Sequence, residues 1–91
     1  AVFDLAGPVP NGLPIAEVDR VIRASAGELL ERLELFDQYT GKGVAPAFRS
    51  LAWRLTFRHA ERTLRDKEIE GRRARILSSL EKELNVRQRS A

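Results

Sequence analysis

The chain has no cysteine and a single histidine, His59, among its 91 residues. The lack of cysteine excludes a disulfide framework, a cysteine-based zinc site, an iron–sulfur cluster and a thiol nucleophile. One histidine without cysteine also disfavours a transition-metal site, so we expect no metal ligands here. The uncharged stretches are too short and too interrupted by glycine and proline to span a bilayer, and the start lacks the layout of a signal peptide. We therefore expect a cytoplasmic domain that does not contact a membrane.

What is present suits a small folded domain. The sequence is 43% hydrophobic and 32% charged, which is enough apolar material for one core and too little length for two. Sixteen Lys and Arg against thirteen Asp and Glu give a net charge of +3, which permits contact with a polyanion without proving it. Because the chain begins at Ala1 rather than at methionine, we expect residues 1–91 to be a single domain cut from a larger subunit.

Hydrophobic periodicity predicts six elements. In chain order they are a strand at 2–6, a helix at 15–26, a strand at 29–39, a strand at 50–57, a helix at 66–84 and a strand at 86–89. This order predicts an α+β fold of the ferredoxin-like βαββαβ type, in which a four-stranded antiparallel sheet carries both helices on one face and leaves the other open. The first strand is expected to end, or to bulge, near Gly7 and Pro8 because proline donates no ladder hydrogen bond. Asp66 is the expected cap of the second helix, with Thr63 as the alternative.

Signals for catalysis are poor. The sequence contains no G-x-S-x-G elbow, no H-E-x-x-H helix and no G-x-x-x-x-G-K-[ST] phosphate loop. His59 is more simply a surface residue in a loop. Carboxylate pairs such as Glu81 with Glu83 are two residues apart on a helix and do not face one another, so they are best explained as solvated helix surface. No catalytic residue is therefore predicted.

Strand parity places small and polar side chains on the open face. In the strand at 50–57, Arg54 alternates with Trp53, and Ser50 and Ala52 share its face. In the strand at 29–39, Phe36 is expected to be the core residue, which would put Tyr39 on the open face together with Asp37. Leu33 and Leu35 then need a bulge to stay buried. A ring, a carboxylate and an arginine on one sheet face are typical of sheets that read unpaired RNA bases, although an exposed polar sheet fits equally well. Arg72, Arg73 and Arg75 are interpreted as solvated charges of the long helix.

Three segments carry a resemblance to a known family. They are Glu34–Gly41 (ELFDQYTG), Ser50–Arg58 (SLAWRLTFR) and Glu61–Asp66 (ERTLRD). Together with Asp4–Ala6 and the long helix, they resemble the C-terminal ferredoxin-fold anticodon-binding domain of bacterial phenylalanyl-tRNA synthetase beta subunits. Two departures from the family are Gly7-Pro8 in the first strand and Arg65, where threonine is common.

The resemblance implies a role in binding the anticodon of phenylalanine tRNA, without catalysis by this domain. The ATP and magnesium used by the parent ligase would bind elsewhere, and the partners would be the rest of the beta subunit and the alpha subunit of an α2β2 heterotetramer. Tyr39 would stack on an anticodon base, Asp37 would accept hydrogen bonds from a guanine edge, and Arg54 would lie near phosphate or base. The remaining matched positions would form a closely approached floor, namely Ala6, Ser50 and Ala52.

Two other functions stay open on the sequence. One is a docking domain whose sheet packs on protein and has no RNA specificity. The other is a small enzyme of the acylphosphatase type on the same fold, which would need an anion-binding loop after the first strand. The segment 5–14 contains three prolines and no basic residue, so it is a poor candidate for that loop.

Overall fold

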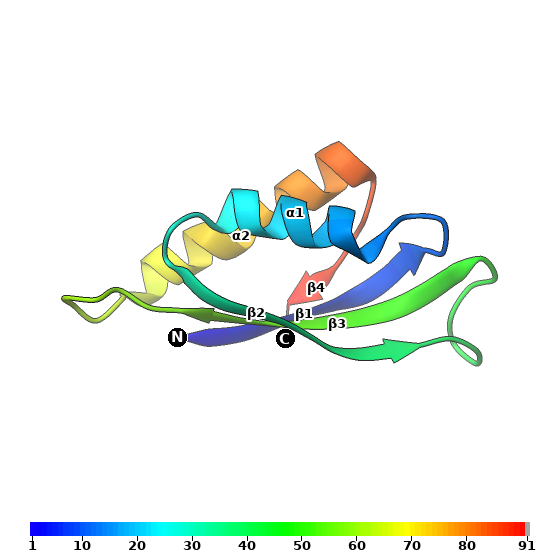
Figure 1. Cartoon of the computed structure of the whole chain (residues 1–91), viewed down its shortest axis with the longest axis horizontal. Coiled ribbons are helices and arrows are strands. Elements are labelled where there is room, and N and C mark those ends of the chain that lie inside the picture. The colour runs from blue at the N-terminus through cyan, green and yellow to red at the C-terminus, as the bar shows by residue number, and fades with distance from the viewer. Residues whose placement is uncertain (91) are drawn as a thin grey trace.

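The computed structural model describes residues 1–90. The strands pair into one sheet, and two amphipathic helices cover one of its faces (Figure 1). The elements, in chain order, are β1 (Val2–Pro10), α1 (Ile15–Ala26), β2 (Leu30–Tyr39), β3 (Phe48–Phe57), α2 (Asp66–Leu84) and β4 (Arg89–Ser90). The sheet order is β2-β3-β1-β4, and every adjacent pair is antiparallel. The predicted ferredoxin-like α+β fold is confirmed. No helix within residues 1–90 is long and apolar enough to cross a membrane.

The core lies between the helices and one face of the central strands. Leu5 and Trp53 are paired neighbours on β1 and β3, and both side chains are buried. Phe3 stacks on Phe57 with ring centroids 5.5 Å apart. The helices complete the core with Val18, Val21 and Ile22 from α1 and with Ile69, Ile76 and Leu80 from α2. Since this core covers only one face, the other face of the sheet is left open (Figure 1).

The first strand does not stop at Pro8. It pairs with β3 without a bulge from Val2 to Pro10, so the predicted end near Pro8 is wrong. The backbone hydrogen bonds from Phe57 to Ala1 and from Asn11 to Ala47 place the bonded pairs at odd positions of β1. Pro8 and Pro10 therefore have their nitrogens turned away from β3. On that side β4 offers them no partner, because within residues 1–90 it pairs only with Leu5 and Ala6.

The second strand is interrupted by two irregularities, one of which changes the predicted position of Phe36. Leu35 pairs with Trp53 and Asp37 pairs with Ala52, so Phe36 is the extra residue of a bulge. Phe36 is 48% exposed, so the prediction that it belongs to the core is wrong. The bulge instead keeps Leu33 and Leu35 packed against the core.

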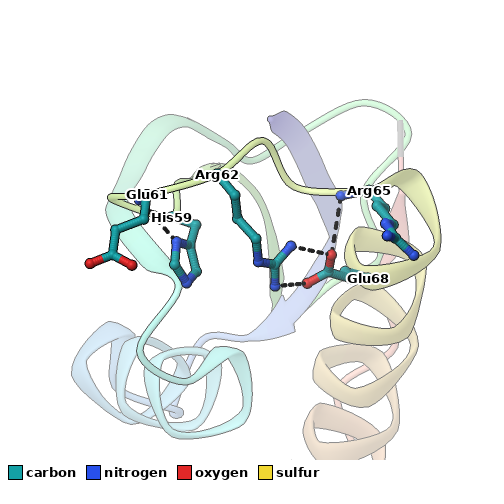
Figure 2. Close-up of polar contacts among 5 residues, drawn as sticks. All are labelled: His59, Glu61, Arg62, Arg65 and Glu68. Atoms are coloured by element: carbon teal, nitrogen blue, oxygen red, sulfur yellow. Dashed lines mark hydrogen bonds and ion pairs between the residues drawn. The ribbon is translucent and has the colours of Figure 1, made fainter.

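The second helix begins at Asp66, but Asp66 is not its cap. Arg65 occupies the cap position, and its backbone N–H donates to the Glu68 carboxylate at 3.3 Å (Figure 2). The sequence suggested Asp66 because aspartate is a preferred cap, whereas here Glu68 supplies the acceptor from within the first turn. The helix ends at Leu84, as predicted, and Asn85 follows it in the left-handed conformation. The last strand begins at Arg89, because Val86 is buried against the core before the chain reaches β1.

Candidate nucleic-acid interface

The centre of the open face is a row of small side chains with a carboxylate at one end. Ala6 and Asp37 both lie directly opposite Ala52, from β1 and β2 respectively. Directly opposed residues project from the same face of a sheet, so the three side chains form one row. Within residues 1–90 the Asp37 carboxylate has no ion-pair partner and no hydrogen bond from a side chain. It is thus an exposed acceptor at the edge of a floor that a flat ring can approach closely.

A second row lies toward the β2–β3 loop and contains the exposed aromatic ring. Tyr39 is opposite Ser50, and Ser50 is opposite Pro8. The Tyr39 ring is 46% exposed, and its hydroxyl donates to the Lys42 carbonyl at 2.9 Å. This bond ties the ring to the loop that follows β2, so a ring with one accessible side is held in a fixed position.

A third row, on the other side of the alanines, is charged. Arg54 lies between Asp4 and Glu34 and donates from Nε and Nη2 to the two carboxylate oxygens of Asp4, at 3.0 and 3.1 Å. Its guanidinium also lies 4.5 Å from the centre of the Phe36 ring. The hydrogen bond from Arg54 lowers the pKa of Asp4, and the same contact raises the pKa of Arg54. Arg54 is therefore already bound to a carboxylate and a ring of its own domain.

The structure brings the six sequence-predicted residues onto one face, in neighbouring rows. They are Ala6, Asp37, Tyr39, Ser50, Ala52 and Arg54. Their chemistry comprises a ring for stacking, a carboxylate for accepting and an arginine for anions or bases, set around small side chains. This is the composition with which exposed sheets bind unpaired bases.

Three further residues of this face were missed. Asp4 shares strand parity with Ala6, so parity alone was enough to find it. Phe36 reaches this face only because of the bulge, which depends on the pairing of β2 with β3. Arg89 lies opposite Ala6, and its place depends on where β4 pairs, which nothing in the sequence specified.

A shallow cleft of about 330 Å³ adjoins the second row. Its walls come from four parts of the chain, and its lining residues are Gly7, Pro8, Gly43, Val44, Ala45, Ser50 and Arg89. The floor is apolar or backbone, and the Ser50 hydroxyl and the Arg89 guanidinium are its polar side-chain groups. The cleft extends the surface beside Tyr39 toward β4. No group of three or more His, Asp or Glu residues within the described chain could hold a metal ion.

Comparison with known proteins gives a consistent result. Residues 2–89 match the model of the ferredoxin-fold anticodon binding domain. The chain is 45% identical over 87 residues to the phenylalanine–tRNA ligase beta subunit of a Synechococcus species, and 46% identical over 83 residues to that of Pseudomonas fluorescens. These alignments cover 96% and 91% of this chain but only 10% of each relative. The chain thus corresponds to about a tenth of the length of these relatives.

Proposed function

Because the chain belongs to the ferredoxin-fold anticodon-binding domain family, we propose that it binds the anticodon loop of phenylalanine tRNA through the open face of its sheet. The observation that carries this proposal is the pair of adjacent rows formed by Tyr39 with Ser50 and by Asp37 with Ala52. They set an exposed ring and an exposed carboxylate two residues apart on one strand, above side chains small enough for close approach.

Each part of this surface suits one kind of contact with an unpaired base. The Tyr39 ring offers a stacking platform, and its fixed position lowers the entropy lost on binding. Asp37 is acceptor-only when ionised, so it suits a base edge that presents two donors, as the Watson–Crick edge of guanine does. Arg54 and Arg89 supply positive charge on either side of the alanines for phosphate.

In this role the domain positions tRNA and performs no chemistry. The aminoacylation reaction, with its ATP and magnesium, belongs to other parts of a phenylalanine–tRNA ligase, and the domain requires no cofactor of its own. Its partners are the remainder of a beta subunit, an alpha subunit in an α2β2 enzyme, and the tRNA. The setting is the cytoplasm, where translation takes place.

The test is an NMR titration of the isotopically labelled chain with the anticodon stem-loop of phenylalanine tRNA, at low and moderate salt. A stem-loop with the same stem and a different loop is the control. Cognate-specific shifts at Asp37, Tyr39, Ser50, Ala52 and Arg54 are expected. Shifts of equal size with both loops, or shifts confined to the helices, would contradict the proposal. Association with a protein through the same face, with no response to either RNA, would favour a docking domain instead.

A further inference from the structure

A second basic surface lies on the helix layer, away from the open face. Two adjoining hollows, of about 610 and 310 Å³, follow the β3–α2 connection and the first half of α2. They share Lys67 and Glu68, and their other lining residues are Arg62, Thr63, Arg65, Gly71, Arg72 and Arg75. We call these two hollows together the α2 groove. Glu68 is the one carboxylate among these lining residues.

The negative charge of the Glu68 carboxylate is already compensated within the domain. Arg62 donates two hydrogen bonds to Glu68, at 2.7 and 2.8 Å, and the backbone N–H of Arg65 donates a third (Figure 2). These contacts hold the pKa of Glu68 at about 2, so it stays ionised and paired near neutral pH. The Arg65 side chain turns away from it (Figure 2).

Three exposed cations of the α2 groove form no ion pair within the described chain. Arg65, Lys67 and Arg75 are exposed, and within residues 1–90 none of them has an ion-pair partner. Arg72 also has no ion-pair partner within residues 1–90, but it is only partly exposed, because its guanidinium lies over Gly27 at the end of α1. Arg75 is solvent-exposed, as expected for a solvated charge of the long helix.

The helix surface between two of these cations carries no side chain, because the residue there is Gly71. Gly71 lies between Lys67 and Arg75 on one stripe of the helix, four residues from each. Nothing lies within 4 Å of the position that a Cβ atom of Gly71 would occupy. At a rise of about 1.5 Å per residue, Lys67 and Arg75 are separated by about 12 Å along the helix, with open space between them.

We propose that the α2 groove binds the phosphate backbone of RNA at a segment other than the loop read by the open face. An extended anion is favoured because the uncompensated charges are spread along the helix instead of converging on one point. Arginine forks suit phosphate oxygens, and a backbone contact requires no base to be unpaired. Tyr39 lies opposite Ser50, near the start of β3, whereas the groove begins in the connection that follows the end of β3 and continues along α2, in the helix layer (Figure 1). The two surfaces are therefore separate.

The test uses a short, blunt RNA duplex, which offers backbone but no unpaired base to Tyr39. Its affinity for the chain is measured by fluorescence anisotropy over a range of salt concentrations. Three phosphate contacts predict a log–log salt slope of about −3, since each contact contributes roughly −0.9 in a duplex. The double variant Lys67→Ala/Arg75→Ala should reduce the magnitude of that slope by about 2. The control Arg20→Ala/Lys82→Ala removes the same charge from exposed helix positions outside the groove and should leave the slope unchanged.

A second variant separates binding from folding. Gly71→Glu places a carboxylate on the groove floor and replaces a poor helix former, so it should raise the melting temperature while weakening duplex binding tenfold or more. The inference is overturned if the wild-type chain does not bind the duplex at low salt, or if Lys67→Ala/Arg75→Ala binds it as the control does. It is also overturned if an oligoglutamate of equal charge displaces the bound duplex as effectively as additional duplex does. The partner would then be an acidic protein surface.

This inference and the proposed function fail separately. Tyr39→Ala should weaken binding of the anticodon stem-loop roughly tenfold or more and leave the affinity for the duplex unchanged. If the wild-type chain fails to bind the anticodon loop but binds the duplex through Lys67 and Arg75, the proposed function is wrong and the α2 groove stands.

Discussion

Arg54 donates two hydrogen bonds to Asp4, its direct neighbour across the β1–β3 ladder, so the central cation of the open face is already bound to a carboxylate of its own sheet. Phe36 covers the other side of the same guanidinium. The arginine is thus held in place over the sheet, and part of its charge is compensated before any ligand arrives. If the open face binds RNA as proposed, the availability of Arg54 depends on Asp4, which the sequence pattern did not indicate.

We expect Asp4→Asn to strengthen binding of the anticodon stem-loop. The substitution removes a negative charge from the binding face and frees Arg54, so the magnitude of the log–log salt slope should rise by about 0.7, the value for one added phosphate contact on a single strand. Fluorescence anisotropy at several salt concentrations measures this. Asp19→Asn removes an equal charge on α1 and should change nothing. If Asp4→Asn weakens binding, Asp4 acts by positioning Arg54.

Replacing Phe36 by alanine tests the bulge in β2. Since the ring is half exposed and its contact is with Arg54, the loss of unfolding free energy should be about 1 kcal/mol or less. Phe57→Ala removes a buried ring and should cost about 3–5 kcal/mol. Urea denaturation of both variants gives the comparison, and equal losses would mean that Phe36 is a core residue after all.

These two residues show why parity worked for one strand and not for its neighbour. β3 is regular from Phe48 to Phe57, so the alternation of Trp53 with Arg54 alone assigned both faces. In β2 the alternation shifts at Phe36, and the shift arises from cross-strand pairing, which a single strand's pattern does not contain. Asp37 and Tyr39 were still placed correctly, because they follow the bulge.

Backbone hydrogen bonding explains another difference from the sequence prediction. The sequence prediction ended the first strand near Pro8 because proline donates no ladder hydrogen bond. In the structure, however, the nitrogens of Pro8 and Pro10 do not face β3. Whether a proline interrupts a strand depends on which edge its nitrogen faces, and that requires the register. The helix boundaries needed no such knowledge: α1 spans Ile15–Ala26 and α2 spans Asp66–Leu84, as predicted, and Gly27 and Asn85 follow their last residues.

The Arg62–Glu68 pair should make stability depend on acid pH. Its hydrogen bonds lower the pKa of Glu68 from 4.5 to about 2, so the stabilisation is complete above the unfolded value and is lost as pH falls through the folded one. Between pH 4.5 and about 2, Glu68→Gln should therefore show a shallower fall in unfolding free energy than the wild-type chain. The amide oxygen of glutamine can still accept from the Arg65 backbone, so the difference reports the charge.

Urea denaturation at a series of pH values measures this dependence. Glu28→Gln is the matched control, because the Glu28 carboxylate makes no ion pair within residues 1–90. Parallel curves for wild type and Glu68→Gln would contradict the assignment.

Gly7 has a packing role that is not predicted from the sequence, where Gly7 and Pro8 are interpreted only as an interruption of the first strand. A Cβ atom at Gly7 would lie 2.8 Å from the Arg87 carbonyl oxygen and 2.9 Å from Gln88 Nε2, in the segment that leads from α2 to β4. Gly7→Ala should therefore push this segment off the sheet and lower the unfolding free energy by about 1–3 kcal/mol. Gly12→Ala meets nothing within 4 Å and should be neutral within about 0.5 kcal/mol. Equal thermal melting of the two variants would show that the crossing is not tight.

The proposed function stands most directly on the Tyr39 ring, and one comparison of affinities tests it. The dissociation constant of the anticodon stem-loop of phenylalanine tRNA is measured for the wild-type chain, Tyr39→Phe and Tyr39→Ala. A stacked base contributes about 1–3 kcal/mol, so Tyr39→Ala should weaken binding roughly tenfold or more. Tyr39→Phe keeps the ring and loses only the bond to Lys42, so its affinity should stay close to wild type. Equal affinities for all three chains would contradict base stacking on Tyr39.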